Sequence, residues 1–270
     1  MTNAISNAKT LLVKVPAITL FFWIIKVLST TVGETLADYV NQSFGLTDNS
    51  SDAETLRIMN ETALFMGGVL IVLLLAQFAM RKYVPAIYWA AIVAVSAEGT
   101  MITDDMHTNY GWQNWQLTIL FGLILLAVFA IWWAQERTLS IKTINTRKRE
   151  GFYWVAVLAT FAMGTAGGDI FLDDLGWPLL NSTAVFAAVI AMLAVLWRFK
   201  VVGQVFGFWS IYILTRPLGA SFGDYLSLSK ADAPDALGLG ANNITALFLG
   251  LIAVLVIYLT ISKRDVIKLD

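Results

Sequence analysis

The sequence predicts an all-α integral membrane protein in which eight transmembrane helices come from four tandem two-helix repeats. Hydrophobic residues make up 58% of the chain and charged residues only 14%, a balance far from that of soluble globular domains. The apolar stretches are continuous rather than alternating, which favours helices over strands. A motif of the form W-x9-G-x4-D occurs four times, once in each predicted repeat.

Each predicted span is close to the ~20 residues that an α-helix needs to cross the hydrocarbon core. The spans cover residues 16–37, 62–80, 84–104, 116–135, 152–171, 182–199, 203–224 and 243–262. Consecutive spans pair into repeats at approximately 10–80, 81–136, 146–200 and 201–263, which form one transmembrane domain over residues 1–270. The loops are too short to hold a separate soluble domain.

The first span follows a polar start flanked by Lys9 and Lys14, without the features of a cleaved signal, and is predicted to be a retained helix. Only the odd-numbered spans carry the motif, while even-numbered stretches such as 69–80 and 118–133 are almost wholly apolar. We therefore expect the odd helices to line a central site and the even helices to face lipid. The motif residues are Trp23, Gly33 and Asp38; Trp89, Gly99 and Asp104; Trp154, Gly164 and Asp169; and Trp209, Gly219 and Asp224. Three copies add a glycine seven residues after the aspartate, namely Gly45, Gly111 and Gly176.

The basic residues indicate an orientation in the membrane. Of the 18 lysines and arginines, 14 lie at one set of helix ends, whereas only Arg57 and Lys230 lie in the opposite loops. Both termini are therefore predicted to be cytoplasmic. Because each repeat contains two spans, all four repeats enter the bilayer in the same direction, as parallel repeats about an axis along the membrane normal.

The repeated motif resembles that of a known family. Stretches such as FFWIIKVLSTTVGETLADY (21–39) and FWSIYILTRPLGASFGDY (208–225) are similar to bacterial membrane proteins with four tandem two-helix repeats, each holding a tryptophan. That family is described only as a repeat of unknown function. The resemblance covers essentially the whole chain, and it implies an eight-helix bundle without implying a chemistry. We expect a multi-pass protein of the bacterial inner membrane.

The motif glycines allow two interpretations. Each glycine either packs against a neighbouring helix by close approach, or lies where its helix opens and frees backbone carbonyls for a cation. Local sequence favours opening in repeats 3 and 4, because Gly167 and Gly168 follow Gly164, and Pro217 precedes Gly219. Both interpretations stay open at the level of sequence.

The candidate binding residues are acids placed inside apolar spans. Ionisable groups there cost several kcal/mol unless they are paired or hydrated, so they usually mark a pathway or a proton relay. Glu34 and Glu98 adjoin the motif glycines of repeats 1 and 2 and make the repeats unequal. The predicted ion or metal ligands are Glu34, Asp38, Glu98, Asp104, Asp169 and Asp224, supported by Thr31, Thr100, Thr165, Lys26 and Arg216.

Each of these predictions has a structural alternative. The aspartates can be solvated at the outer interface, although a carboxylate near a helix C-terminus opposes the helix dipole. Glu34 and Glu98 can form buried ion pairs with Arg216 or Lys26, and Arg216 is favoured as a counter-ion rather than a ligand. Lys26 can also extend toward an interface. The tryptophans fit an aromatic belt or bundle packing, and they are not predicted to be ligands.

An environment of carboxylates and hydroxyls is typical of sites for Mg²⁺, Ca²⁺, Mn²⁺ or H⁺. Cysteine is absent and His107 is the only histidine, so sites for softer metals are not expected. Unequal acids favour a proton-coupled carrier over a passive pore. The leading hypothesis is a secondary transporter of a cation, as a proton-coupled exporter of a divalent metal such as Mn²⁺ or Mg²⁺. The alternatives are a proton-coupled exporter of organic cations, held by charge and cation–π contacts, and a cation channel.

An enzyme is not expected. The surroundings of Asp169 and Asp224, AGGDI and SFGDY, lack a glycine that an intramembrane aspartyl protease would need, and there is no G-x4-G-K-[ST] phosphate loop. No bound cofactor is predicted, and a cation would be cargo. The predicted partners are the lipid bilayer, a small cation and protons, without nucleic acid, and the oligomeric state stays open.

Overall fold

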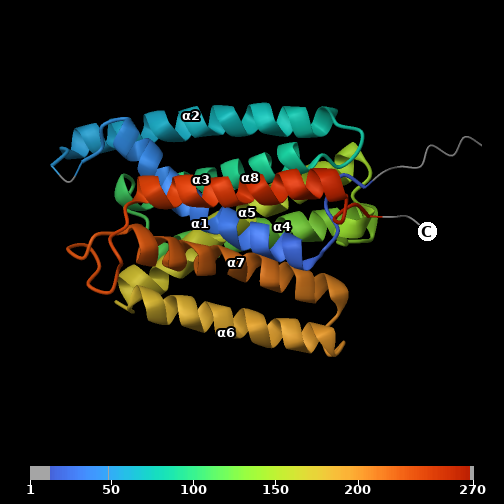
Figure 1. The fold of residues 1–270 in the computed structure, drawn as a ribbon. Coiled ribbons are helices and arrows are strands. Elements are labelled where there is room, and N and C mark those ends of the chain that lie inside the picture. Colours follow the sequence, from blue (N-terminus) through green and yellow to red (C-terminus); the bar gives the residue numbers. More distant parts are fainter. Residues whose placement is uncertain (1–12, 48, 268–270) are drawn as a thin grey trace, which may run out of the picture.

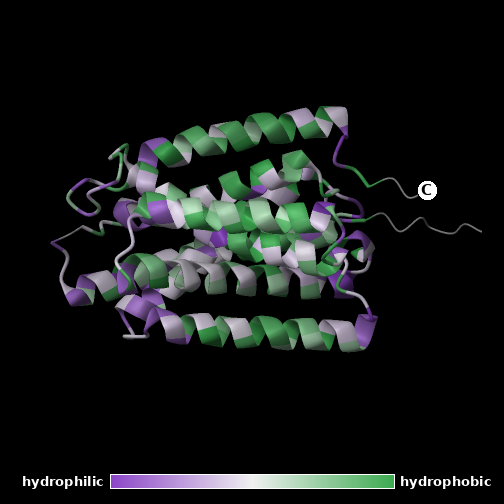
Figure 2. Ribbon diagram, turned by 90° about the horizontal axis from the view of Figure 1, so that it is seen from below, coloured by the Kyte–Doolittle hydropathy of each residue, from purple (hydrophilic) through white to green (hydrophobic). Residues whose placement is uncertain are grey.

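The fold class predicted from the sequence is confirmed. A computed structural model describes residues 13–47 and 49–267, and within these residues the regular structure is helical, with eight α-helices and no strand. Seven of the eight are long and apolar enough to cross a membrane, and the less apolar exception is α7. Figure 2 shows hydrophobic residues along the middle of the helices and hydrophilic residues gathered near their ends. Lys9, which enters the prediction for the first span, lies outside the described residues.

The helices are longer than the apolar runs that predict them. They are α1 (Leu20–Ser43), α2 (Asp52–Ala79), α3 (Pro85–Thr108), α4 (Asn114–Glu136), α5 (Arg147–Asp169), α6 (Leu179–Arg198), α7 (Gln204–Ser227) and α8 (Ala241–Ser262). A 3₁₀ turn (Ile141–Thr143) precedes α5, and a π-helical turn (Ile170–Asp174) follows it.

Local capping explains where the first two helices begin. The first span was predicted to begin at 16, but α1 begins at Leu20, because the Thr19 side chain accepts a hydrogen bond from the backbone N–H of Phe22 and caps the helix there. The second span was predicted to begin at 62, but α2 begins at Asp52. Ser51 and Glu54 form a reciprocal capping box that starts the helix in a polar stretch.

The four odd helices form a closed ring, in which α1 contacts α3, α3 contacts α5, α5 contacts α7 and α7 contacts α1. Each motif glycine packs against the next odd helix of the ring. The residue that it contacts there lies three positions before the motif glycine of that helix. A Cβ added at the glycine would lie 2.9 Å from the carbonyl carbon of Ser96 at Gly33, 2.9 Å from Cβ of Phe161 at Gly99, 2.6 Å from Cβ of Arg216 at Gly164, and 2.8 Å from the carbonyl carbon of Thr30 at Gly219. The fourfold glycine is therefore a device for close helix packing.

Of the two interpretations left open for the motif glycines, the structure agrees with close packing and not with an opening of the odd helices in repeats 3 and 4. Helix α5 is continuous to Asp169, and α7 is continuous through Pro217. The glycines of α5 instead make room for the proline, since a Cβ at Gly164 would lie 3.2 Å from Cδ of Pro217 and one at Gly168 would lie 3.1 Å from its Cβ. The glycine cluster of one repeat thus accommodates the proline of the next.

The even helices lie outside the ring, each against the odd helix that follows it in the cycle. Helix α2 packs on α3, α4 on α5, α6 on α7, and α8 returns to α1 (Figure 1). Their outer faces carry exposed apolar side chains such as Leu64, Leu126 and Val254. This arrangement agrees with the expectation that the odd helices surround the centre while the even helices face lipid.

The two ends of the bundle differ, and we name them by the motif. The tryptophan end holds the four motif tryptophans, and the aspartate end holds the four motif aspartates. At the aspartate end, Gly45, Gly111 and Gly176 all have positive φ, of 102°, 69° and 63°. A left-handed residue is the usual way to terminate a helix, which explains these three glycines. Repeat 4 has no counterpart, and a longer loop follows α7.

Residues 13–17, which we call the strap, cross the tryptophan end. The backbone N–H of Lys14 donates to the carbonyl of Ile144 (2.9 Å), and that of Ala17 donates to the carbonyl of Asp265 (2.7 Å). The Lys14 ammonium forms a buried ion pair with Glu150 (2.6 Å), which also accepts a hydrogen bond from Gln77 (3.1 Å). The beginning and the end of the described chain therefore meet at this end (Figure 1).

We expect Lys14→Met to loosen the strap, because the substitution leaves the Glu150 carboxylate buried without its cation. The test uses the absence of cysteine in the chain. A cysteine at Val15, which is only 1% exposed, should react with a water-soluble maleimide at least about tenfold faster in the Lys14→Met background, which corresponds to ~1.4 kcal/mol of lost protection. Equal rates in the two backgrounds would show that the ion pair does not hold the strap.

Candidate functional site

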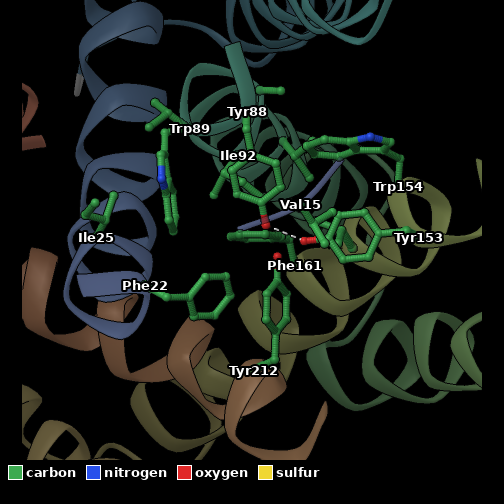
Figure 3. Close-up of a cluster of buried hydrophobic side chains, with 14 of the residues drawn as sticks. Val15, Phe22, Ile25, Tyr88, Trp89, Ile92, Tyr153, Trp154, Phe161 and Tyr212 are labelled. Carbon is green, nitrogen blue, oxygen red and sulfur yellow. Dashed lines mark hydrogen bonds between the residues drawn. The ribbon is translucent and has the colours of Figure 1, made fainter. Parts of the chain in front are cut away.

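An aromatic layer closes the ring at the tryptophan end. The aromatic residue before each motif tryptophan packs against the tryptophan of the next repeat, and the cycle closes. The ring centroids are 5.6 Å apart for Phe22 and Trp89, 5.7 Å for Tyr88 and Trp154, 6.2 Å for Tyr153 and Trp209, and 5.8 Å for Phe208 and Trp23. Figure 3 shows Phe22, Tyr88, Tyr153 and Tyr212 pointing toward one another from the four odd helices, with Val15 of the strap beside them and a hydrogen bond between the hydroxyls of Tyr88 and Tyr153 (2.5 Å).

The motif tryptophans pack inside the bundle and do not form an aromatic belt at the membrane interface. Trp89, Trp154 and Trp209 are 1%, 3% and 4% exposed, and Trp23 is half-buried. An interfacial belt would leave the rings in contact with lipid and headgroups. The repeated tryptophan therefore completes the closure of one end of the ring.

Lys26 lies next to this layer, inside the ring. Its side chain is 1% exposed, and its ammonium lies 3.8 Å from the ring centroid of Phe161 and 4.1 Å from that of Tyr212. Among the described residues the ammonium has no hydrogen-bond partner. The alternative that Lys26 extends toward an interface is therefore wrong, and two aromatic faces take the place of a counter-ion.

Arg216 and Glu34 form the ion pair at the centre of the ring. One Arg216 nitrogen lies 2.6 Å from the Glu34 carboxylate, with 1% and 12% of the two side chains exposed. The guanidinium also donates to the backbone carbonyl of Thr30 (3.3 Å) and to the hydroxyl of Thr100, which in turn donates to Glu34 (3.4 Å). These groups come from α1, α3 and α7, so the pair ties three helices of the ring together. The predicted counter-ion role of Arg216 agrees with this geometry.

The four motif aspartates lie beyond the ion pair, at the aspartate end. All four are half-buried. Asp104 and Asp224 lie within electrostatic range of Glu34, Asp38, Asp169 and Arg216. Within the described chain no hydrogen bond or ion pair involves any of the four carboxylates. We call Lys26, Arg216, Glu34 and these aspartates the charged axis.

Other predicted site residues lie elsewhere. The hydroxyls of Thr31 and Thr165 donate to carbonyls of their own helices, those of Val27 (3.1 Å) and Phe161 (3.0 Å). Glu98 faces α2, close to Gly67. The motif itself explains the separation. Glu34 follows its glycine and Glu98 precedes its glycine, so the two positions are ~200° apart around equivalent helices.

The structure does not assemble the predicted metal ligands into one site. In residues 13–47 and 49–267, no group of three or more histidine, aspartate or glutamate side chains could hold a metal ion. Glu34, the innermost acid of the axis, is already engaged by Arg216. A cation would therefore have to compete with the guanidinium for this carboxylate.

Sequence reasoning did not identify the aromatic partners of Lys26 or the residues that anchor the strap. Phe161 and Arg216 occupy the same position in repeats 3 and 4, three residues before the motif glycine. Glu34 lies one residue after the motif glycine of repeat 1, which is four positions further along the equivalent helix. Residues four apart share a helix face. Aligning the four repeats residue by residue would thus have placed Phe161, Arg216 and Glu34 on the inner face of the ring.

A closed ring of four motif-bearing helices, covered by four apolar helices, defines a helical membrane protein with internal fourfold repetition. The chain belongs to the family described as Repeat of Unknown Function (DUF347), whose model matches residues 21–83, 87–138, 152–201 and 207–265. The four matches correspond to the four predicted two-helix repeats. A search of curated proteins and a search of solved structures each found no match to the chain.

Proposed function

We propose that the protein is a secondary transporter that carries a cation along the charged axis in exchange for protons. The observation that supports this proposal best is the buried Arg216–Glu34 pair at the centre of the ring, in line with four carboxylates that have no partner in the described chain. Ionisable groups at membrane depth usually mark a transport pathway or a proton relay. We propose a carrier rather than an enzyme, without a resident cofactor.

The balance of charge on the axis favours a cation as cargo. Five acids (Glu34, Asp38, Asp104, Asp169 and Asp224) face two bases, Lys26 and Arg216. Two of these seven groups are held in the ion pair, which leaves four aspartates and one lysine on the axis. A cation that reached Glu34 would free Arg216, whose positive charge would in turn oppose return of the cation. Through this competition, the Glu34 carboxylate binds the cargo and Arg216 in turn.

The closure of the tryptophan end favours a carrier over a channel. The aromatic layer and the strap cover that end of the ring, and the half-buried aspartates lie at the other end. Alternating access requires a site that is closed on one side at a time. Following the distribution of basic residues, we propose that the protein lies in the bacterial inner membrane with both termini in the cytoplasm and the aspartate end outside.

A divalent metal such as Mn²⁺ or Mg²⁺ is the first cargo to test, since carboxylates and hydroxyls suit hard cations. Glu34→Gln and Asp104→Asn should each lower proton-driven metal flux into proteoliposomes at least about tenfold, if each removes ~1.4 kcal/mol or more of cation binding in the pathway. The control is Asp235→Asn, in the loop that follows α7. Unchanged metal flux in both axis variants would refute this proposal for metals.

An organic cation is the second candidate cargo, favoured by one observation. The rings of Phe161 and Tyr212 already hold an ammonium group, that of Lys26, by cation–π contacts. The two cargoes can be separated by measuring flux of a metal and of a lipophilic ammonium through the same liposomes. Transport of the ammonium alone, lost in Glu34→Gln, would assign the protein to organic cations.

A further inference from the structure

Glu98 is a buried carboxylate outside the charged axis. It is 8% exposed and lies near the middle of α3, where its side chain faces α2. A Cβ added at Gly67 of α2 would lie 3.1 Å from Oε1 of Glu98, so the missing side chain leaves the space that the carboxyl occupies. The surroundings are apolar, since Met66 of α2 packs with Ala97 and Met101 of α3.

The carboxyl of Glu98 takes part in no hydrogen bond or ion pair among the described residues, and its Oε2 is fully buried. Charged groups on the helices around α3 lie elsewhere. On α1, Glu34 is paired with Arg216, Lys26 lies over the rings of Phe161 and Tyr212, and Asp38 lies at the aspartate end. Helix α8 has no charged residue. The charges of α2 and α5 lie toward the ends of those helices, at Asp52, Glu54, Arg57, Glu61, Arg147, Lys148, Arg149, Glu150 and Asp169. An ionised carboxylate in such a place would cost several kcal/mol.

The shared fold does not require an acid at this position. The equivalent residues of the other repeats are Val32, Met163 and Leu218, all apolar. An apolar residue would fill the α2–α3 contact without the cost of burying a polar group. A feature of repeat 2 alone, combined with a facing glycine, indicates a role that the other three repeats do not share.

We propose that Glu98 is a proton-binding site between α2 and α3, and that its proton is the one exchanged for the cation carried on the charged axis. The second part rests on the proposed function. The cargo then binds on the charged axis, and the coupling proton binds beside it, between α2 and α3.

The proton-binding part can be tested by chemical modification of the full-length protein in liposomes. Dicyclohexylcarbodiimide partitions into lipid and adds to a protonated carboxyl. The carboxyl oxygen bonds to the central carbon of the reagent, and the proton moves to one of its two nitrogens. The acyl group then transfers from that oxygen to the other nitrogen, the oxygen stays on the central carbon as the urea carbonyl, and the stable N-acylurea forms with no leaving group. Peptide mass spectrometry locates the adduct.

We expect an adduct on Glu98 at acidic pH that declines at alkaline pH, and none on Glu34, which is paired with Arg216. Gly67→Ala should reduce the modification, because the new methyl group crowds the carboxyl. Absence of an adduct on Glu98 at acidic pH, or modification that does not change with pH, would overturn the proposal.

The coupling part is tested with Glu98→Gln, which fixes this position in a neutral form. We expect cation exchange without a pH gradient to stay within about twofold of wild type, and accumulation driven by a pH gradient to fall at least about tenfold. Gradient-driven accumulation that survives in Glu98→Gln would overturn the coupling role. If the wild-type protein moves no cation, the proposed function and the coupling role fail together, while the adduct on Glu98 still decides whether the site binds a proton.

Discussion

Gly219→Ala is expected to destabilise the bundle severely, because no space exists for a methyl group between α7 and α1. Its Cβ would lie 2.8 Å from the carbonyl carbon of Thr30, and it would also overlap the Thr30 side chain. A clash with backbone is relieved only by moving a whole helix, so the cost should reach the upper end of overpacking, about 3 kcal/mol or more. Thermal unfolding in detergent, followed by loss of the monodisperse species, measures the change.

Gly250→Ala on the outer helix α8 is the matched control. Nothing lies within 4 Å of a Cβ at that position. The intrinsic preference of alanine over glycine, ~1 kcal/mol within a helix, should leave this variant as stable as wild type or slightly more stable. Equal stability of the two variants would contradict the close packing of the odd helices that the fourfold glycine is held to provide.

Arg216→Met is expected to produce the second large effect, since it leaves the Glu34 carboxylate inside the ring without its cation. Breaking a buried ion pair from one side typically costs 3–5 kcal/mol, and the burial of both side chains places this pair in that class. The double variant Arg216→Met/Glu34→Gln removes both charges and should recover most of the stability. The measurement is a double-mutant cycle of thermal stability in detergent.

Transport separates the two roles of this pair. The rescued double variant should be folded but inactive in cation flux, because the axis has lost its innermost carboxylate. If Arg216→Met alone is as stable as wild type, the pair does not hold the ring together. If the double variant is stable and transports normally, the pair is structural and the cation takes another route.

The sequence was sufficient for the helices, because eight apolar runs report directly on burial in lipid. It was also sufficient for the four repeats, since the motif marks each odd helix once. It was not sufficient for the start of α2, where Ser51 and Glu54 extend a helix into polar sequence. Hydropathy measures the fit to the membrane, whereas helix ends depend on capping.

The packing of the repeats was beyond single-helix reasoning. Sequence order suggests that the two helices of a repeat form a unit, yet each even helix packs mainly on the odd helix of the next repeat, and α8 closes the circle on α1. The motif glycines likewise allowed either an opening or a close contact. The continuity of α5 and α7 and the close approach of all four motif glycines to the next odd helix decide in favour of contact.

The residues of the candidate site could be predicted from the sequence, but their arrangement could be predicted only in part. Glu34, Arg216 and Thr100 come together, and Lys26 lies beside them over two aromatic rings. Hydropathy alone does not distinguish rings that contact a cation from rings that only pack in the core. Glu98 was grouped with Glu34 by depth, although the two positions of the motif point to different sides of equivalent helices. Depth in the membrane is read easily from sequence, while rotation about the helix axis requires the repeats to be aligned.

Cation passage along the charged axis can be measured directly with a single cysteine at Thr100. The Thr100 hydroxyl contacts both Glu34 and Arg216, and the chain contains no other cysteine. A cationic thiol reagent added during turnover should label Thr100→Cys and abolish cation flux, and excess cargo should slow the labelling. The same reagent at Val254→Cys, which is 65% exposed on the lipid-facing side of α8, should leave flux unchanged. Failure to label position 100 during turnover, or full flux after labelling, would contradict a pathway along this axis.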